Sequence, residues 1–307
     1  MVLVAGGTGR LGTAVVELLT KRGMHVRVLT RDRAKAKHLP ESVEVAIGDV
    51  REPSTLAATT AGVTTVVSAV QGLDDRKSSP EATDRDGNRN LIDAAKAAGV
   101  EHFVLVSVLG ASRDHPMSIN RAKHVAEQYL KQGGLAWTIV RPTAYMEFWA
   151  QLVGKPLIDT GKTQVFGRGD NPINFVSVRD VAMAIEKAIV DPGMRGLELD
   201  MGGPENLTLN QVVEIFEQAG RAQGALVKTG QRAKVSHMPL PVMKMMSVLM
   251  RPINPALARI AQAGVVMDTT HMTWDGSANR ARYPWLAQTP LIEVIKEGQK
   301  RKLERGD

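Results

Sequence analysis

A glycine-rich turn near the N-terminus places the strongest constraint on how this chain can fold. Residues 4–12 read Val-Ala-Gly-Gly-Thr-Gly-Arg-Leu-Gly, directly after an apolar segment and directly before a helical pattern. At this spacing Gly6 permits a tight bend, Gly9 lets the backbone approach a pyrophosphate, and Gly12 lets the helix pack closely on the strand. The N–H groups that open the helix would also bind phosphate. We therefore expect a nucleotide site here, and a tight turn without ligand is the alternative.

Short β-branched runs then alternate with helical patterns through the first two thirds of the chain. The runs are nearly continuous in apolar residues, which is typical of strands buried on both faces of a parallel sheet. Alternation of this kind predicts right-handed βαβ units and an α/β fold with a doubly wound parallel sheet. The expected strands are 2–5, 25–30, 43–47, 64–70, 102–108 and 136–141, and the expected helices are 12–22, 53–60, 80–98 and 121–132.

The length of 307 residues corresponds to about two domains. After Pro142 the sequence becomes rich in turn residues and then mostly helical. We expect residues 1–150 to form the nucleotide-binding domain, with 175–202 rejoining its sheet. Residues 151–174 and 203–307 would form a small, mostly helical substrate or lid domain. The Met-rich segment 240–267 has either a packing role or serves as an adaptable apolar lid.

The composition excludes several classes of function. The absence of Cys excludes disulfides, thiolate metal sites and a Cys nucleophile. The net charge of +7 is scattered, and no aromatic residues interleave the basic runs, so nucleic acid is not an expected partner. The seven His residues do not pair at metal-ligand spacing, so we expect no metal site. With neither a targeting peptide nor an apolar run of about 20 residues, we expect a cytoplasmic protein without a membrane span.

The end of the second expected strand bears on which nucleotide would bind. NAD-binding folds usually carry an acid there, about 20 residues past the turn, which holds the ribose 2′-hydroxyl. Here the strand ends in Arg31, whose guanidinium can bind a 2′-phosphate through two hydrogen bonds at once, as a bidentate contact. This favours NADP(H), with Arg10 and Arg33 close in sequence to the same region. Asp32 is an acid beside Arg31, and it leaves NAD(H) as the alternative.

Taken together, the motifs resemble those of the atypical short-chain dehydrogenase/reductases. The resemblance covers roughly residues 1–200, and the most similar subgroup is the NmrA-like and triphenylmethane- or quinone-reductase-like proteins. The motifs that carry it are the turn at 6–12, Leu-Thr-Arg-Asp at 29–32, Gly-Asp-Val at 48–50, Gly-Asn-Arg-Asn-Leu-Ile-Asp-Ala-Ala at 87–95, Val-Leu-Val-Ser at 104–107, Arg-Pro-Thr at 141–143 and Phe-Val-Ser-Val-Arg-Asp-Val-Ala at 175–182.

This resemblance implies an extended Rossmann domain with a small C-terminal substrate domain, and chemistry or sensing based on NADP(H). It also implies roles for individual residues. The pyrophosphate would contact Gly6, Thr8, Gly9, Arg10 and Leu11, and the 2′-phosphate would contact Arg31. Adenine would lie against Asp49 and Val50, and the cofactor against Ser68, Ala69 and Val70. The nicotinamide end would meet Lys123, Ser107, and the stretch from Pro142 to Tyr145.

One departure from the family pattern limits the chemistry. The catalytic Tyr that normally precedes the lysine by four positions is Ile119 here, and isoleucine transfers no proton. We therefore expect an oxidoreductase that transfers hydride to a small, apolar, conjugated acceptor such as a quinone or a dye. Tyr145 and His115 are the candidate substitute acids.

Two other functions stay open. The first is a non-catalytic, NADP(H)-sensing regulatory protein, for which a protein partner or a homodimer is conceivable. The second is a sugar-nucleotide epimerase or reductase. Ile119 argues against the second, because that chemistry oxidises an alcohol and needs a base.

Overall fold

The computed structural model describes residues 1–222 and 234–305 of the chain. It divides into two compact units. Unit 1 comprises Met1–Pro142 and Val178–Met201, and unit 2 comprises Thr143–Ser177 and Gly202–Asp307. Parts of the expected domain at 203–307, namely residues 223–233 and 306–307, lie outside the described residues.

Unit 1 is built on a seven-stranded sheet in the order β10-β6-β5-β4-β1-β2-β3. Every neighbouring pair is parallel. The central strands are buried along their whole length, as their near-continuous Val, Leu and Ile content predicts. The strands are β1 (Val2–Ala5), β2 (Val26–Thr30), β3 (Glu44–Ile47), β4 (Thr65–Ser68), β5 (His102–Val106), β6 (Ala136–Pro142) and β10 (Leu197–Met201).

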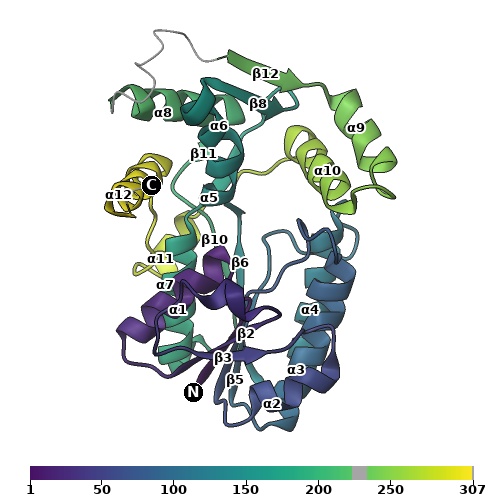
Figure 1. Cartoon of the computed structure of the whole chain (residues 1–307), viewed down its shortest axis with the longest axis vertical. Helices are drawn as coiled ribbons and strands as arrows, with labels where there is room; N and C mark the ends of the chain where they lie inside the picture. The colour runs from purple at the N-terminus through teal and green to yellow at the C-terminus, as the bar shows by residue number, and fades with distance from the viewer. Residues whose placement is uncertain (223–233, 306–307) are drawn as a thin grey trace. The chain divides into compact units, whose positions relative to one another are not determined.

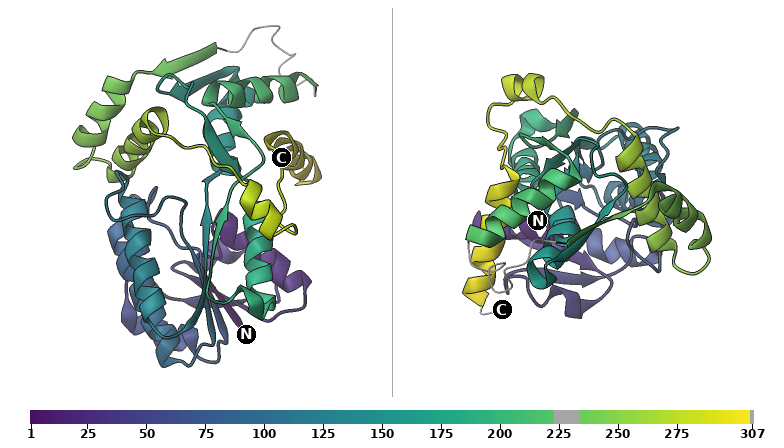
Figure 2. Two further views of the ribbon diagram at one scale, coloured as in Figure 1. Left: turned by 180° about the vertical axis from the view of Figure 1, so that it is seen from behind. Right: turned by 90° about the horizontal axis from the view of Figure 1, so that it is seen from above.

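Helices cover both faces of this sheet (Figures 1 and 2). On one face α1 packs against α7, and on the other α3 packs against α2 and α4. Leu91, Ile92 and Leu130 from the second group meet Phe103 and Ile139 of the sheet in one buried core. The prediction of a doubly wound α/β fold is confirmed. The helical elements are α1 (Arg10–Lys21), η1 (Arg33–Ala36), η2 (Pro53–Thr55), α2 (Leu56–Thr60), η3 (Glu81–Gly87), α3 (Asn88–Ala97), α4 (Ser118–Gln132), α7 (Val178–Val190) and η5 (Pro192–Met194).

The expected strand 64–70 is shorter in the structure and ends at Ser68. At this point the N–H of Ala69 donates to the carbonyl oxygen of Ala5 at 2.9 Å, and the chain then leaves the ladder close to Gly6. A side chain on Gly6 would place its Cβ 2.6 Å from the carbonyl oxygen of Ala69. The strand ends where the two backbones approach closely. Ala69 and Val70 then line a pocket instead of extending the strand.

The chain returns to the large sheet later than the sequence indicates. Residues 197–201 form β10, which pairs with β6. Phe175 and Val176, however, belong to β9 (Ile173–Val176), which pairs with β7 (Ala144–Tyr145) and β11 (Asn206–Leu207) in a separate three-stranded sheet of unit 2. The return therefore begins with α7, and the strand before it stays in unit 2.

Unit 2 combines this small sheet with a two-stranded sheet and a set of helices. Its core gathers Trp149, Phe175 and Phe216 among aliphatic residues. The remaining elements are α5 (Met146–Trp149), η4 (Ala150–Gly154), α6 (Lys155–Thr160), β8 (Lys162–Phe166), α8 (Leu209–Ala222), β12 (Lys234–Met238), α9 (Leu240–Leu249), α10 (Pro255–Thr269), α11 (Ser277–Arg282) and α12 (Leu291–Arg305).

The Met-rich segment forms the pair of helices α9 and α10. Met243 is completely buried, and the close approach of α10 at Gly264 leaves room for its sulfur atom. Met245, by contrast, is 53% exposed. The segment therefore has a packing side and an exposed side. Across the described residues, no helix combines the length and apolarity needed to cross a membrane.

Candidate cofactor site

Three glycines shape the turn between β1 and α1. Gly6 has a φ of +82°, in the region that favours glycine. The N–H of Gly9 donates to the carbonyl oxygen of Gly6 at 3.0 Å. A Cβ on Gly12 would lie only 2.1 Å from that same oxygen. The turn is compact because Gly6 adopts a conformation that favours glycine and Gly12 has no room for a side chain.

The N-terminus of α1 is suited to an anion. The helix begins at Arg10, its N-cap is Gly9, and no side chain caps its first N–H groups. No acidic residue lies in its first turn. Uncapped N–H groups and the positive end of the helix dipole therefore face the solvent side of the turn. This is the arrangement that binds the phosphates of nucleotides.

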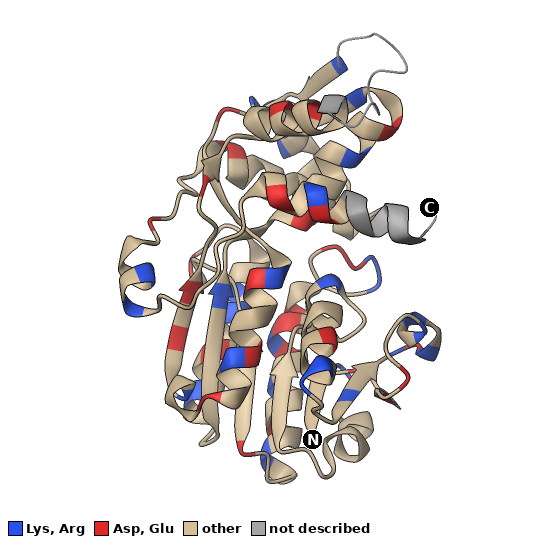
Figure 3. Cartoon of the chain, turned by 90° about the vertical axis from the view of Figure 1, so that its left-hand side faces the viewer, with Lys and Arg blue, Asp and Glu red and all other residues tan. Residues whose placement is uncertain are grey.

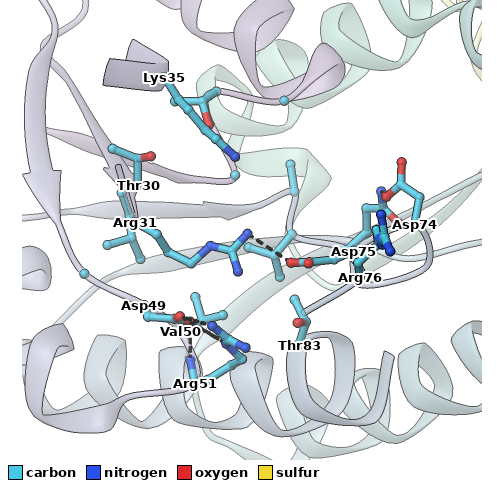
Figure 4. A pocket seen from close by; sticks show the side chains of 18 residues that line it. Thr30, Arg31, Lys35, Asp49, Val50, Arg51, Asp74, Asp75, Arg76 and Thr83 are labelled. Atoms are coloured by element: carbon cyan, nitrogen blue, oxygen red, sulfur yellow. Dashed lines mark hydrogen bonds and ion pairs between the residues drawn. The ribbon is translucent and has the colours of Figure 1, made fainter. Parts of the chain in front are cut away.

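A pocket of about 500 Å³ lies next to this turn, at the carboxyl ends of the strands of unit 1 (Figure 4). The strand order reverses here, since β2 follows β1 on one side and β4 lies on the other. Such a switch point is where open α/β sheets bind ligands. The lining residues are Gly6, Thr8, Gly9, Leu29, Thr30, Arg31, Lys35, Gly48, Asp49, Val50, Arg51, Ala69, Val70, Gln71, Asp74, Asp75, Arg76 and Thr83.

Two ion pairs organise the charged part of the pocket (Figure 4). The Nε of Arg51 donates to both carboxylate oxygens of Asp49 at 3.0 Å. An Nη2 atom of Arg31 lies 3.0 Å from the carboxylate of Asp75. Burial alone would raise the pKa of both carboxyls. For Asp49 the hydrogen bonds from Arg51 outweigh it, and for Asp75 those from Lys77 and Arg31 do, so both pKa values lie below the usual range.

Asp32, the acid that left NAD(H) as the alternative cofactor, caps a helix in the structure. The carboxylate of Asp32 accepts a hydrogen bond from the N–H of Ala34 at 2.9 Å and caps η1. Asp32 is not among the residues that line the pocket, whereas Arg31 and Lys35 are. The side of the pocket next to β2 therefore offers cations to a ligand.

The structure brings together eight of the residues expected to contact cofactor. Ser68 lines no part of this pocket, because its hydroxyl donates to the side-chain oxygen of Asn88 at 2.6 Å in the interior. Leu11 is buried, and Pro142 accepts a hydrogen bond at its carbonyl from the N–H of Leu109 at 2.9 Å. Those eight are Gly6, Thr8, Gly9, Arg31, Asp49, Val50, Ala69 and Val70, and those not lining the pocket are Arg10, Leu11, Ser68, Lys123 and Pro142.

Lys123 is held in a buried network behind the pocket. Its ammonium donates to the carbonyl oxygen of Val70 at 2.9 Å and lies 3.0 Å from the carboxylate of Asp84. The other oxygen of Asp84 accepts from the N–H of Gly72 at 2.8 Å. Burial raises the pKa of Asp84, and Lys123 opposes that change. The pair ties α4 and η3 to the backbone that lines the pocket.

The serine that the resemblance assigned to the nicotinamide end is present, but position 119 on α4 carries no proton donor. Ser107 is 5% exposed, and its hydroxyl has no hydrogen-bond partner among the described residues. Asn120 also has a buried side-chain oxygen without a partner in the described part of the chain. Ile119 precedes Lys123 by one turn of α4. The buried polar atoms are available to a ligand, while the aliphatic side chain is not an acid.

Neither substitute acid has an environment that favours proton donation. Burial, together with Glu147, raises the pKa of Tyr145, which makes its phenol a weaker acid. Tyr145 belongs to unit 2. Burial, together with Arg121, lowers the pKa of His115, and its Nδ1 accepts a hydrogen bond from the N–H of Met117. In both side chains the shift of the pKa favours the neutral form.

Much of the charged lining of the pocket was not predicted from the sequence. Arg51 follows the Asp49-Val50 pair that was singled out, and the run from Gln71 to Arg76 directly follows the fourth strand. Both stretches follow strand ends, where loops meet at one edge of a parallel sheet. Their position after strand ends was the sequence signal that could have identified these residues. Within the described chain, no group of three or more His, Cys, Asp or Glu side chains could hold a metal ion.

The surface charge of unit 1 mixes both signs (Figure 3). Arg27 pairs with Glu44, and Arg141 pairs with Glu127 and Glu198. Carboxylates thus lie beside these cations, as Asp49 and Asp75 lie beside the arginines of the pocket.

Comparison with known proteins agrees with this geometry. The model of a family described as NAD(P)H-binding matches residues 6–192. An NAD(P)H azoreductase from Xenophilus azovorans is 33% identical over 239 residues, which cover 76% of this chain and 79% of that protein. The photosystem II assembly factor Ycf39 from Trieres chinensis is 26% identical over 80% of this chain and 74% of its own length.

A solved structure has the same fold along nearly the whole chain. NADPH-dependent quinone oxidoreductase QOR2 from Escherichia coli, complexed with NADPH, superimposes with a TM-score of 0.75 at 22% identity. The superposition covers 97% of this chain and 99% of that one. The resemblance that the sequence motifs indicated is confirmed at the level of family and fold.

Proposed function

Because the chain belongs to the NAD(P)H-binding family, we propose that it is an NADP(H)-dependent oxidoreductase that reduces an apolar, conjugated acceptor such as a quinone or a dye. The observation that carries the cofactor assignment is the pocket at the switch point of the sheet, with Arg31 and Lys35 beside the end of β2. A 2′-phosphate bears a charge of about −1.5 to −2, which these cations would neutralise.

The bound dinucleotide would supply the hydride, and the protein would position the two reactants. The N–H groups at the start of α1 would bind the pyrophosphate. Val70, fixed by Lys123, would line the path towards the nicotinamide end. Ser107, whose hydroxyl is free among the described residues, would offer a hydrogen bond at that end.

The acceptor class follows from the missing acid. With Ile119 in the position of the usual Tyr, no phenol stands four residues before Lys123 to protonate a carbonyl during hydride transfer. A quinone accepts hydride without such an acid, because resonance stabilises the anion formed and water then protonates it, and a cationic dye becomes neutral when it accepts hydride and needs no proton. Catalysis would then rest on proximity and orientation. The azo bond that the Xenophilus relative's name implies belongs to the same range of conjugated acceptors.

The test is NADPH oxidation, followed by absorbance, with a quinone, a triphenylmethane dye and an azo dye as acceptors. We expect saturable turnover with at least one acceptor, faster than the reaction of free NADPH with it. Tight binding of NADPH with no turnover for any acceptor would contradict the enzymatic proposal. Binding of neither NADPH nor NADH at millimolar concentration would contradict the cofactor assignment itself.

A second candidate is a cofactor-sensing protein without turnover. The similarity to Ycf39, whose name describes an assembly factor, favours it, as does Ile119 in the position of the usual Tyr. Such a protein would bind NADP⁺ and NADPH with different affinities and bind a protein partner differently in the two states. Equal affinities, or turnover in the acceptor assay, would count against this candidate.

A further inference from the structure

The guanidinium of Arg31, which would bind a 2′-phosphate, is already paired with the carboxylate of Asp75. Arg31 lies at the end of β2, and Asp75 reaches it from the loop that follows β4 (Figure 4). The Nη2 of Arg31 and a carboxylate oxygen of Asp75 are 3.0 Å apart. The side chain of Arg31 is 47% exposed and that of Asp75 21% exposed. The pair therefore stands at the wall of the pocket, where solvent and ligand can reach it.

The loop at residues 71–79 holds this carboxylate in place by contacts of its own. The second oxygen of Asp75 accepts from the N–H of Lys77 at 2.8 Å. The carbonyl oxygen of Lys77 accepts from Arg51 at 3.2 Å, and the N–H of Gly72 donates to Asp84 at 2.8 Å. Both ends of the loop are thus fastened, and Asp75 faces Arg31 without needing that arginine to shape its turn.

We propose that Asp75 is a specificity-determining residue that limits the preference of the pocket for NADPH over NADH, by competing with the 2′-phosphate for Arg31. With NADH, Asp75 stays paired with Arg31 and neutralises it. With NADPH, the 2′-phosphate takes the place of the carboxylate on Arg31, and Asp75 is displaced. The inference rests on the proposed function, since it assigns a role within the same cofactor pocket.

The charges on each ligand explain the exchange. The ribose of NADH ends in neutral hydroxyls, which cannot neutralise a guanidinium, so Asp75 keeps its partner. The phosphate of NADPH carries up to twice the charge of a carboxylate and forms charge-assisted bonds with Arg31. It would also repel Asp75 at short range. Lys35 and Arg76 line the same pocket and can attract the phosphate while the carboxylate leaves.

The decisive variant is Asp75→Asn, assayed by titration of NADPH and NADH against the full chain. The amide keeps an oxygen that can accept from the N–H of Lys77, so the loop retains its turn. We expect the affinity for NADPH to rise about tenfold, equivalent to about 1.4 kcal/mol, because the competing charge is gone. The affinity for NADH is expected to change less than about twofold.

Two further variants separate the ion pair from a general effect of charge. Asp74 lies in the same loop, and its carboxylate accepts from the side chain of Gln71 at 2.5 Å. Asp74→Asn removes the same charge and is expected to raise the affinity for NADPH less than Asp75→Asn does. In an Arg31→Met background, Asp75→Asn is expected to bring no gain, because the two effects pass through one contact.

Three results would overturn the proposal. These are an equal gain for NADH and NADPH in Asp75→Asn, an equal gain in Asp74→Asn, and an unchanged or weaker affinity for NADPH in Asp75→Asn. Titration with 2′,5′-ADP and 5′-AMP repeats the comparison with ligands that differ only by the 2′-phosphate. If the unmodified protein binds neither dinucleotide, the cofactor assignment fails instead, so the two failures are distinguishable.

Discussion

At the scale of single residues, the buried pair of Lys123 and Asp84 is a contact that the sequence did not indicate. The family resemblance assigned Lys123 to the nicotinamide ribose, yet its side chain is 4% exposed and that of Asp84 is completely buried. The charges compensate each other, and the lysine also fixes the carbonyl of Val70. In a chain with Ile119, the lysine has no tyrosine to activate. Its evident contribution is to hold the wall of the pocket.

This arrangement predicts a large cost for breaking the pair from one side. Lys123→Met would leave the carboxylate of Asp84 buried without its cation, and we expect the free energy of unfolding to fall by about 3–5 kcal/mol. The double variant Lys123→Met/Asp84→Asn should regain part of that loss, because it buries no unpaired charge. Denaturation by urea, followed by circular dichroism, measures both.

The matched control is Lys187→Met in the same unit. Lys187 pairs with Asp191 at 3.0 Å, but both side chains are more than a third exposed. Exposed pairs contribute about 0–1 kcal/mol, so this variant should unfold almost like the unmodified chain. A similar loss for both lysine variants would argue against a special role of burial at Lys123.

At the scale of elements, the junction of β1 and α1 shows why a glycine inside a helix can be indispensable. Glycine is normally unfavourable in a helix. At Gly12, however, a Cβ would also meet the Cα of Gly7 at 2.6 Å, beside the clash with Gly6. These contacts are backbone atoms, which cannot turn aside as a flexible side chain could. The close packing of strand and helix therefore outweighs the helix propensity at this position.

We expect Gly12→Ala to destabilise unit 1 by about 3 kcal/mol, at the upper end for overpacking, and to weaken the binding of NADPH. The control is Gly298→Ala in α12, where a Cβ would meet nothing within 4 Å. That variant should gain about 0.5–1 kcal/mol of stability from helix propensity. Chemical denaturation and cofactor titration of both variants make the comparison. A Gly12→Ala protein of unchanged stability would refute this account of the turn.

At the scale of the whole molecule, stability responds to pH through a buried histidine. His102 is 2% exposed at the start of β5, and its Nε2 lies 3.0 Å from the hydroxyl of Thr138. That hydroxyl donates to the carbonyl of Met194 at 2.7 Å, so Nε2 must carry the proton and donate to Thr138. Burial, together with the charge of Arg195, lowers the pKa of His102 to about 4. The fold therefore holds the neutral ring.

The sign of the pH effect follows from this lowered pKa. An unfolded chain binds a proton at His102 below about pH 6.5, whereas the folded chain does so only below about pH 4. Stability from this residue is present above pH 6.5 and declines as the pH falls towards 4, by up to about 3 kcal/mol. The carboxyls with lowered pKa values, such as Asp49 and Asp75, lose their contributions at lower pH.

The measurement is the free energy of unfolding between pH 7.5 and 4 for the unmodified chain and for His102→Gln, which keeps an N–H that can reach Thr138. We expect the difference between the two proteins to shrink as the pH falls through this window. A constant difference would contradict the role of His102.

Much of the fold could be predicted from the sequence because local signals agree with each other there. The glycine turn at 6–12 and the apolar runs that became β1 to β6 specify βα units, since a strand buried on both faces leaves a continuous apolar segment. Two-residue strands leave no such signal. β7 and β11 were therefore not foreseen, and the strand at Ile173–Val176 could not be assigned to its sheet.

The amino-acid sequence alone determined the turn, the type of pocket and the cation at the end of β2, because each depends on residues close together in the chain. Tertiary structure decided what those residues touch. It paired Arg31 with Asp75 across 44 positions and buried Lys123 against Asp84. It also joined the hydroxyl of Ser68 to Asn88 in the interior. Such contacts join loops and helices distant in sequence, and only the folded sheet brings their ends to one edge.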